Sequence, residues 1–223
     1  MPGKFLEKKY PSIRDLNRIW SADYADYDDF MSSRKIRFDK RKSHSDMAAF
    51  GRVMIDRYYR VCRDAVRRNA PNHLYLGSRL RPLPDADLQV AYIANQYCDV
   101  VSINSYYLLY RDLGMPGITK PIWLSEYSIR ADGRGYWGAQ PYRDQKERAE
   151  VFQQVFRDIL ANPALVGASW FCYRSQLVTG RDARGEAYPF GFVDITDTPY
   201  PEMTRTTRRL SETMYDIRFR EEK

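Results

Sequence analysis

Short apolar runs alternate with amphipathic segments over most of residues 73–217, and this alternation is the strongest constraint on the fold. Apolar runs bounded by turn residues predict buried strands, and the four runs are 73–80, 99–105, 121–127 and 165–173. Apolar residues recur at helical spacing in three segments, 86–97, 144–161 and 203–217, with a shorter helical turn near 108–113. Strands separated by helices indicate βαβ units in a parallel sheet.

The part of the chain before residue 70 predicts helices without strands. Apolar residues recur at three- and four-residue spacing over 4–20, with Ser12 as an expected N-cap. The polar segment 21–42 predicts a long connection, and 45–69 predicts a long helix with one apolar face. The start of that helix resembles a capping box formed by Ser43 and Asp46.

The length of 223 residues is enough for one globular domain with a sizeable core. We therefore expect a single domain over 1–223, with a helical and loop lead-in at 1–44 and four βα units over 45–223. A closed (β/α)8 barrel needs eight strands and typically about 250 residues. The predicted fold class is therefore α/β, TIM-barrel-like, with about half of a barrel.

The formal net charge of +7 comes from 36 Lys and Arg against 29 Asp and Glu, and much of the excess lies on predicted helices. We interpret these as solvated helix faces, because no nucleic-acid-binding module accompanies them. A basic nucleic-acid-binding protein is the least favoured alternative. The three cysteines and two histidines are widely spaced, which predicts no metal and no cofactor.

The chain has no apolar run long enough to predict a membrane span, so we expect no membrane partner. Its first residues also lack the apolar segment of a secretion signal. As written, the sequence predicts a cytoplasmic protein. A secreted protein is the alternative if an N-terminal part is missing.

Glu126 follows the apolar run Pro121–Leu124 and precedes a Gly-rich segment at 131–135. An acidic side chain at the carboxyl end of a parallel strand stands where α/β barrels carry their chemistry. The alternative is a Glu that ends a strand and meets only solvent or an arginine. Glu126 is thus the leading candidate for a catalytic residue.

Several segments, taken together and in chain order, resemble the C-terminal half of a retaining glycoside hydrolase of the (β/α)8 clan A. They are Phe-Leu-Glu-Lys-Lys-Tyr-Pro-Ser-Ile-Arg-Asp-Leu-Asn-Arg-Ile-Trp at 5–20, Asn-His-Leu-Tyr-Leu-Gly-Ser-Arg at 72–79, Asp-Val-Val-Ser-Ile-Asn-Ser-Tyr at 99–106, Lys-Pro-Ile-Trp-Leu-Ser-Glu at 120–126 and Gly-Ala-Ser-Trp-Phe-Cys-Tyr at 167–173. The last match continues through Gly-Phe-Val-Asp-Ile-Thr-Asp-Thr-Pro-Tyr-Pro at 191–201. The pattern is most similar to the β-agarases of glycoside hydrolase family 50, and more distantly to β-galactosidase-like enzymes of family 42.

This resemblance implies strands five to eight of the barrel and a retaining double displacement on β-galactosidic bonds of polysaccharide. Glu126, at the match to strand seven, would be the nucleophile. The implied substrate-binding residues are Arg79, Asn104, Tyr106, Trp170, Tyr173, Gln176 and Arg181. Among them, Arg79 and Tyr106 would stabilise the charge of Glu126, and Trp170 would lie beneath a sugar ring. The alternatives are charge neutralisation for Arg79, a core phenol for Tyr106 and barrel filling for Trp170 and Tyr173.

The resemblance also implies an acid/base Glu in an Asn-Glu pair at the end of strand four, but no Asn-Glu pair occurs in this sequence. Glu7 lies on a predicted helix, too late in the pattern to replace it. We therefore expect galactose-containing carbohydrate as a ligand, and a homo-oligomer or a separate N-terminal half-barrel as a partner that completes the site. The alternative function is a non-catalytic carbohydrate-binding protein or a truncated remnant.

Overall fold

The computed structural model describes residues 2–35, 37–81, 84–106, 110–131, 141–181 and 185–219, without the side chains of residues 2 and 84–87. Its packing divides the chain into two compact units, Met1–Ala65 and Val66–Lys223. The sequence predicted one domain with a lead-in that ends at residue 44. The first compact unit instead extends well into the long helix that follows this lead-in.

The first unit begins with three short helices: α1 (Pro2–Lys9), α2 (Ile13–Trp20) and α3 (Tyr27–Ser32). The Ser12 hydroxyl accepts a hydrogen bond from the backbone N–H of Arg14, so the predicted N-cap at Ser12 is confirmed. Helix α3 interrupts the segment predicted as a long connection. Asp26 caps it by accepting from the Asp29 N–H at 2.7 Å, and its six residues are too few to show a helical period.

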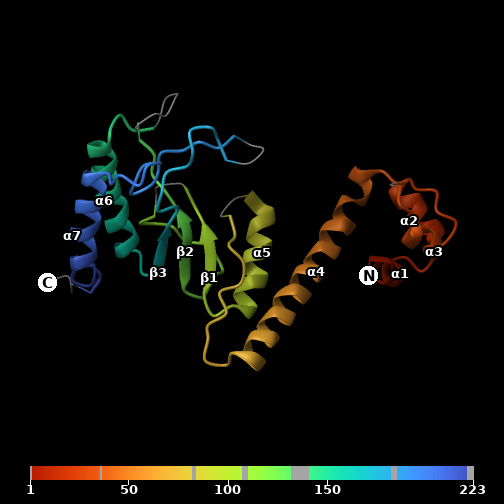
Figure 1. Cartoon of the computed structure of the whole chain (residues 1–223). Helices are drawn as coiled ribbons and strands as arrows, with labels where there is room; N and C mark the ends of the chain where they lie inside the picture. The colour runs from red at the N-terminus through yellow and green to blue at the C-terminus, as the bar shows by residue number, and fades with distance from the viewer. Residues whose placement is uncertain are drawn as a thin grey trace. The chain divides into compact units, whose positions relative to one another are not determined.

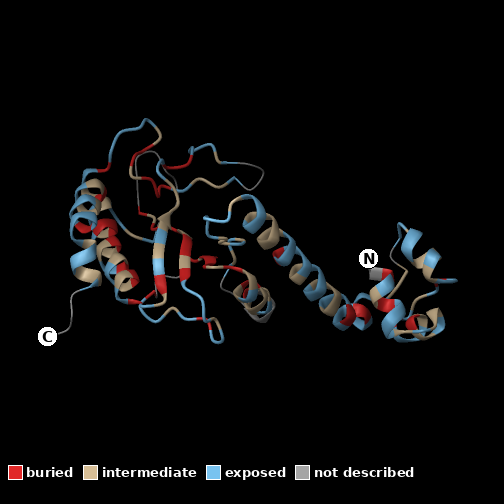
Figure 2. Cartoon of the chain, turned by 90° about the horizontal axis from the view of Figure 1, so that it is seen from below, coloured by how far each residue is buried: buried red, intermediate tan, exposed pale blue. Residues whose placement is uncertain are grey.

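Helix α4 (Lys40–Asn69) begins five residues before the predicted start at residue 45. Asp39 accepts hydrogen bonds from the N–H groups of Arg41 and Lys42, as an N-cap does. The predicted Ser43–Asp46 capping box is wrong, because both residues lie inside the helix. The apolar stripe of α4 is largely exposed (Figure 2), and its exposed members are Met47, Val53, Met54, Tyr58 and Val61.

The second unit contains a parallel sheet in the order β1 (Val101–Asn104), β2 (Ile122–Tyr127) and β3 (Leu165–Trp170). The structure confirms three of the four predicted strands. The remaining predicted strand, 73–80, is the first in chain order and does not form a strand. Its last residue, Leu80, makes a single parallel bridge to Ile103. Gly77 lies in this segment with a φ of 67°, outside the extended region, which interrupts continuous pairing.

Three helices accompany the sheet: α5 (Pro84–Tyr97), α6 (Gln145–Ala161) and α7 (Pro201–Arg218). Helix α5 lies on the β1 side, and the packed pair α6 and α7 lies on the β3 side (Figure 1). Asp144 caps α6 by accepting from the Glu147 N–H, as predicted, whereas the Glu147 carboxylate accepts from Arg143 rather than from the cap residue. Buried side chains of the strands, α6 and α7 form one core, centred on residues such as Ile103, Leu124 and Phe152.

The observed architecture is thus a mixed α/β fold with a small parallel sheet. The segment 171–200 after β3 is irregular, as predicted, and crosses the edge of the sheet toward which the strand arrowheads point (Figure 1). The predicted turn at 108–113 falls partly outside the described residues. Among the helices that the structure describes, none combines the length and apolar character required to cross a bilayer.

Candidate active site

The carboxyl ends of the strands bring the central candidate residues together. Asn104 ends β1 and is the register partner of Glu126, near the end of β2. Arg79 comes directly before Leu80, which pairs with Ile103 in the same direction. Because neighbouring parallel strands end at the same edge of a sheet, these three polar side chains meet there.

Both carboxylate oxygens of Glu126 accept hydrogen bonds. Arg79 Nη1 donates to Oε2 at 2.7 Å and Asn104 Nδ2 donates to the same oxygen at 3.0 Å. The Tyr106 hydroxyl donates to Oε1. The Glu126 side chain is only 13% exposed. One cation and two neutral donors therefore surround a largely buried carboxylate, and all three stabilise its negative charge.

Tyr106 is a stable donor in this arrangement. Burial raises the pKa of Tyr106, and its hydrogen bond to Glu126 and the charge of that carboxylate raise it further. The hydroxyl therefore keeps its proton at neutral pH and continues to donate. The more distant charge of Glu186 also raises the pKa of Tyr106, so the 185–190 part of the irregular segment lies within electrostatic reach of this site.

Ser125 is a positioning residue that the sequence analysis missed. The register shifts between Ile103 and Asn104, so Ser125 is an extra residue in the pairing, as in a β-bulge. Its Oγ lies 2.9 Å from both the Ile103 carbonyl oxygen and Asn104 Oδ1. The Ser125 hydroxyl has one proton and donates to one of these two oxygens at a time, while Asn104 Nδ2 donates to Glu126. The signal in the sequence was a lone serine inside an apolar run, directly before the acidic residue.

Trp170 has the contacts of a core residue. Its ring meets those of Tyr127 and Phe152 edge to face, with centroid distances of 5.2 and 5.3 Å. A third ring, Phe192, lies at 5.3 Å. Its indole N–H donates to the Phe190 carbonyl oxygen at 3.0 Å. These contacts pack Trp170 against the core of the second unit, and its place beneath a sugar ring stays a prediction.

The remaining predicted residues lie on the irregular segment after β3. Tyr173 is exposed, and its carbonyl oxygen accepts from the Phe192 N–H. Gln176 is buried, and its Oε1 accepts from the Tyr188 N–H at 3.0 Å. Arg181 Nη2 donates to Glu186 Oε2 at 2.8 Å. These three contacts connect residues of the irregular segment to one another.

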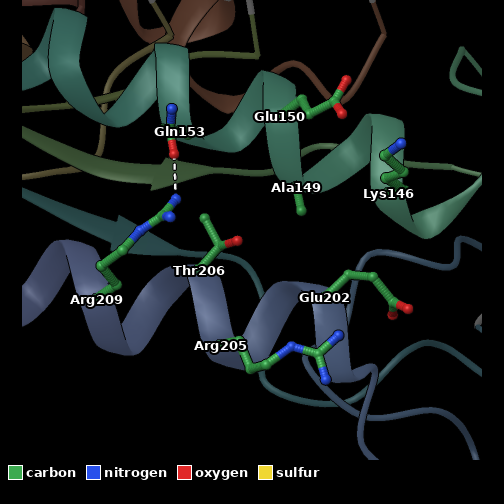
Figure 3. Close-up of a pocket in the computed structure, with 8 residues that line it drawn as sticks. All are labelled: Lys146, Ala149, Glu150, Gln153, Glu202, Arg205, Thr206 and Arg209. Carbon is green, nitrogen blue, oxygen red and sulfur yellow. Dashed lines mark hydrogen bonds between the residues drawn. The ribbon is translucent and has the colours of Figure 1, made fainter.

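A surface hollow with a volume of about 380 Å³ lies away from this site, between α6 and α7, where Arg209 donates to Gln153 (Figure 3). Its lining mixes both charge signs, and the residues are Lys146, Ala149, Glu150, Gln153, Glu202, Arg205, Thr206 and Arg209. It is a groove between two helices, separate from the carboxylate site. Within the described ranges, no group of three or more His, Cys, Asp or Glu side chains could hold a metal ion.

A buried carboxylate bound by donors at the carboxyl edge of a parallel sheet is the site layout of α/β barrel enzymes. Comparison with known proteins agrees with this class. Two curated relatives from Vibrio sp. (strain JT0107) align along almost the whole chain: β-agarase B is 32% identical over 96% of it, and β-agarase A is 31% identical over 95%. No family model matches the chain.

Solved structures give the same relationship. PfGH50B superposes on 98% of this chain with a TM-score of 0.78 and 28% identity, and the aligned part is 33% of PfGH50B. An exo-β-agarase superposes on 98% with a TM-score of 0.75 and 31% identity, over 31% of that enzyme. The agarase AgWH50C gives a TM-score of 0.74 at 30% identity, over 98% of this chain and 32% of that one.

The chain is a homologue of the glycoside hydrolase family 50 β-agarases. It spans 23% and 22% of the two curated relatives, or about a quarter of their length. The resemblance predicted from the sequence motifs is therefore confirmed at the level of the family. The family relationship alone does not assign the activity of the longer relatives to this chain.

Proposed function

We propose that this chain carries the nucleophile half of a β-agarase-type glycosidase site, with Glu126 as the nucleophile. The observation that carries the proposal is the set of three donors on the Glu126 carboxylate, at the carboxyl edge of the parallel sheet. An ionised carboxylate fixed in orientation is what a retaining glycosidase uses to attack an anomeric carbon. The family relationship makes β-linked galactose in polysaccharide the expected substrate class.

In the proposed reaction, a Glu126 oxygen forms a bond to the anomeric carbon while the bond from that carbon to the leaving oxygen breaks. The leaving oxygen takes a proton from a second carboxylic acid. Water then attacks the glycosyl ester, gives its proton to the second carboxylate and releases Glu126. Arg79, Asn104 and Tyr106 donate hydrogen bonds to Glu126 and orient its oxygens.

The second carboxylic acid is expected from outside this chain. The curated relatives of this chain are about four times longer than the chain, and the sequence of the chain contains no Asn-Glu pair. We propose that an N-terminal half-barrel, or a second copy of the chain, supplies this group and covers the free edges of the sheet. The exposed apolar stripe of α4 supports the proposal, since contiguous apolar surface of this kind commonly marks an interaction site.

A carbohydrate-binding protein without turnover is the second candidate function. It is favoured by the same missing Asn-Glu pair, because general acid assistance is worth about 10² to 10⁴ in rate. In that case the donor-bound Glu126 would accept hydrogen bonds from sugar hydroxyls. Turnover of a natural galactan would then be undetectable, while binding would remain.

A trapping experiment separates the nucleophile from the missing acid. The probe is 2-deoxy-2-fluoro-β-galactosyl fluoride, whose fluoride leaves without needing a proton and whose glycosyl ester hydrolyses slowly. Wild-type chain incubated with the probe should gain one fluorogalactosyl group, and peptide mass spectrometry should place it on Glu126. The matched control is Glu126→Gln, which should gain none.

A folded wild-type chain that gains no label, alone or in complex with an N-terminal half from a relative, would contradict the nucleophile role. If agarose oligosaccharides still bind that chain in calorimetry, the second candidate function stands. A label on any other residue would also reject Glu126. Light scattering on the same samples reports whether completion requires a second copy.

A further inference from the structure

Arg148 is an arginine whose side chain is fully enclosed. It lies in the first turns of α6 with 0% of its surface exposed. Its Nε donates to the Ile129 carbonyl oxygen at 3.0 Å, and its Nη1 donates to Gln145 Oε1 at 2.8 Å. Its Nη2 donates to the carbonyl oxygens of Phe190 and Gly191. The guanidinium therefore joins α6 to two other segments, one 19 residues away and one 42 to 43 residues away in the sequence.

This placement is unfavourable for the charge of Arg148. The acceptors among the described residues are backbone and amide oxygens rather than a carboxylate, and burial lowers the pKa of Arg148 to about 10. The helix dipole is positive near the N-terminus of α6, which disfavours a cation there. Packing against the rings of Trp170 and Tyr200 offsets part of this cost. An apolar side chain would leave the carbonyl oxygens of Ile129, Phe190 and Gly191 without this donor.

The two segments held by Arg148 follow β2 and β3 in the chain. Ile129 follows Glu126 by three residues, on the extension of β2 beyond the sheet. The Phe190 carbonyl oxygen accepts from both Arg148 and the Trp170 indole, which ends β3. Arg148 thus joins the extensions of β2 and β3 to the 185–193 part of the irregular segment.

Gly191 shows how closely these segments approach. A Cβ at this position would lie 2.2 Å from the Ser175 nitrogen and 2.4 Å from the Val193 oxygen, too close for any side chain. The Ser175 hydroxyl accepts a hydrogen bond from the Gly191 N–H at 3.0 Å. On the other side, Arg148 donates to the Gly191 carbonyl oxygen. The backbone at this point is therefore fixed from both directions.

We propose that Arg148 is a positioning residue that fixes Glu126 and the irregular segment relative to each other. It acts through Ile129 on the β2 side and through Phe190 and Gly191 on the other, and it does not touch the carboxylate. Its role in placing a nucleophile rests on the proposed function; its role in fixing the Glu126 environment does not.

The test uses Arg148→Met and Arg148→Lys, with Arg218→Met as the matched control. Arg218 also donates to backbone carbonyl oxygens, those of Leu160 and Asn162 at 2.6 Å, but at the opposite end of α6. The probe is the ¹³C-carboxyl NMR signal of Glu126 in the full chain, assigned by its loss in Glu126→Gln. Hydrogen exchange around residues 129–131 and 188–193 is measured on the same samples.

We expect both Arg148 variants to shift or broaden the Glu126 signal and to speed exchange in both segments by at least tenfold. The control should lower the melting temperature and leave the Glu126 signal in place. A folded Arg148 variant with a wild-type Glu126 signal and wild-type exchange would overturn the proposal. If neither variant folds, the wild-type ¹⁵N spectrum decides: rapidly exchanging, averaged Arg148 Nη signals would also overturn it.

These readouts remain informative if the proposed function fails. Absence of fluorogalactosyl label in the wild type would reject the nucleophile role, whereas the Glu126 signal would still differ between the Arg148 variants and the control. If the wild type is labelled, the Arg148 variants should be labelled about 10²-fold more slowly, as expected when a reacting group is displaced by about 1 Å.

Discussion

Asp46 and Glu126 are carboxylates with similar donors in different parts of the molecule. Asp46, in the first unit, accepts hydrogen bonds from Lys9, from the Tyr10 hydroxyl at 2.6 Å and from the Trp20 indole at 2.9 Å. Glu126, in the second, accepts from an arginine, a tyrosine hydroxyl and an asparagine amide. Each carboxylate has one cation, one phenol and one N–H group.

The difference lies in where the donors come from. The donors of Asp46 come from α1, from the residue that follows it and from α2, so this carboxylate joins helices that share a small aromatic core. Asp46 is only 3% exposed. The donors of Glu126 are the last residue of β1, the residue two positions beyond β1 and the residue directly before Leu80, at the edge of the sheet where α/β barrels bind substrates. A donor set alone therefore does not distinguish the two carboxylates; their positions in the fold do.

Among the predicted changes, Glu126→Gln should have the largest effect on labelling of the candidate site. We expect fluorogalactosyl labelling to fall by on the order of 10⁴-fold or more, because the amide cannot attack the anomeric carbon. The free energy of unfolding should change by no more than about 1 kcal/mol, since the amide keeps the shape and most hydrogen bonds. Labelling kinetics and urea unfolding measure the two effects. A large loss of stability would place Glu126 in the same class as Asp46.

Asp46→Ala should give the reverse result. Removing the carboxylate leaves the Trp20 indole and the Tyr10 hydroxyl without their acceptor, which should lower the free energy of unfolding by about 2 to 4 kcal/mol. The ¹³C signal of Glu126 should not move. Urea unfolding followed by far-ultraviolet circular dichroism checks the first statement. Asp15→Ala, which removes only an exposed pair with Arg18, is the control and should change stability by less than about 1 kcal/mol.

Tyr106→Phe tests one donor of Glu126, the Tyr106 hydroxyl. The phenol keeps its proton because burial and Glu126 raise its pKa, so the variant loses a donor on Oε1 without losing a charge. We expect labelling to slow by about 10- to 100-fold, measured as the time profile of fluorogalactosyl labelling. Tyr110→Phe, which removes a donor to the Ser105 carbonyl oxygen instead, serves as the matched control. Equal profiles for the two variants would show that the Tyr106 hydrogen bond is not used.

The smallest expected effect is the acid sensitivity of the first unit. Burial raises the pKa of Asp46, but the hydrogen bonds from Lys9, Tyr10 and Trp20 outweigh burial, and the net pKa is lowered. A lowered pKa contributes stability above the ordinary carboxyl value of about 3.9, and this contribution is lost as the pH falls through the folded-state value. Helicity measured between pH 5 and pH 2, in 2 M urea, should therefore fall more steeply in the wild type than in Asp46→Asn.

That slope should not vanish entirely in the variant. The N–H of Ala25 and the guanidinium of Arg37 also lower the pKa of Asp29, which lies in the same unit and retains its own acid dependence. Identical slopes for wild type and variant would show that Asp46 is not the dominant acid-sensitive group.

Local patterns in the sequence were sufficient for several elements. The caps at Ser12 and Asp144, the strand that ends near Glu126 and the helical spacing of α6 and α7 each depend on residues within a few positions of each other. Such signals survive folding because hydrogen bonds between near neighbours form them. The family relationship was also predictable, since several motifs occur in the expected order.

The tertiary structure alone decided the roles of Asp46 and Arg148. Asp46 looked like part of a helix cap, but its partners lie 26 to 37 residues away. Arg148 was not singled out by any local pattern, and two of its acceptors lie 42 and 43 residues away. The sequence placed an acidic residue at the end of a strand; the register of the strands chose which donors meet it. The physical reason is that capping and periodicity act over one or two turns, whereas the packing of a buried charge depends on every segment that encloses it.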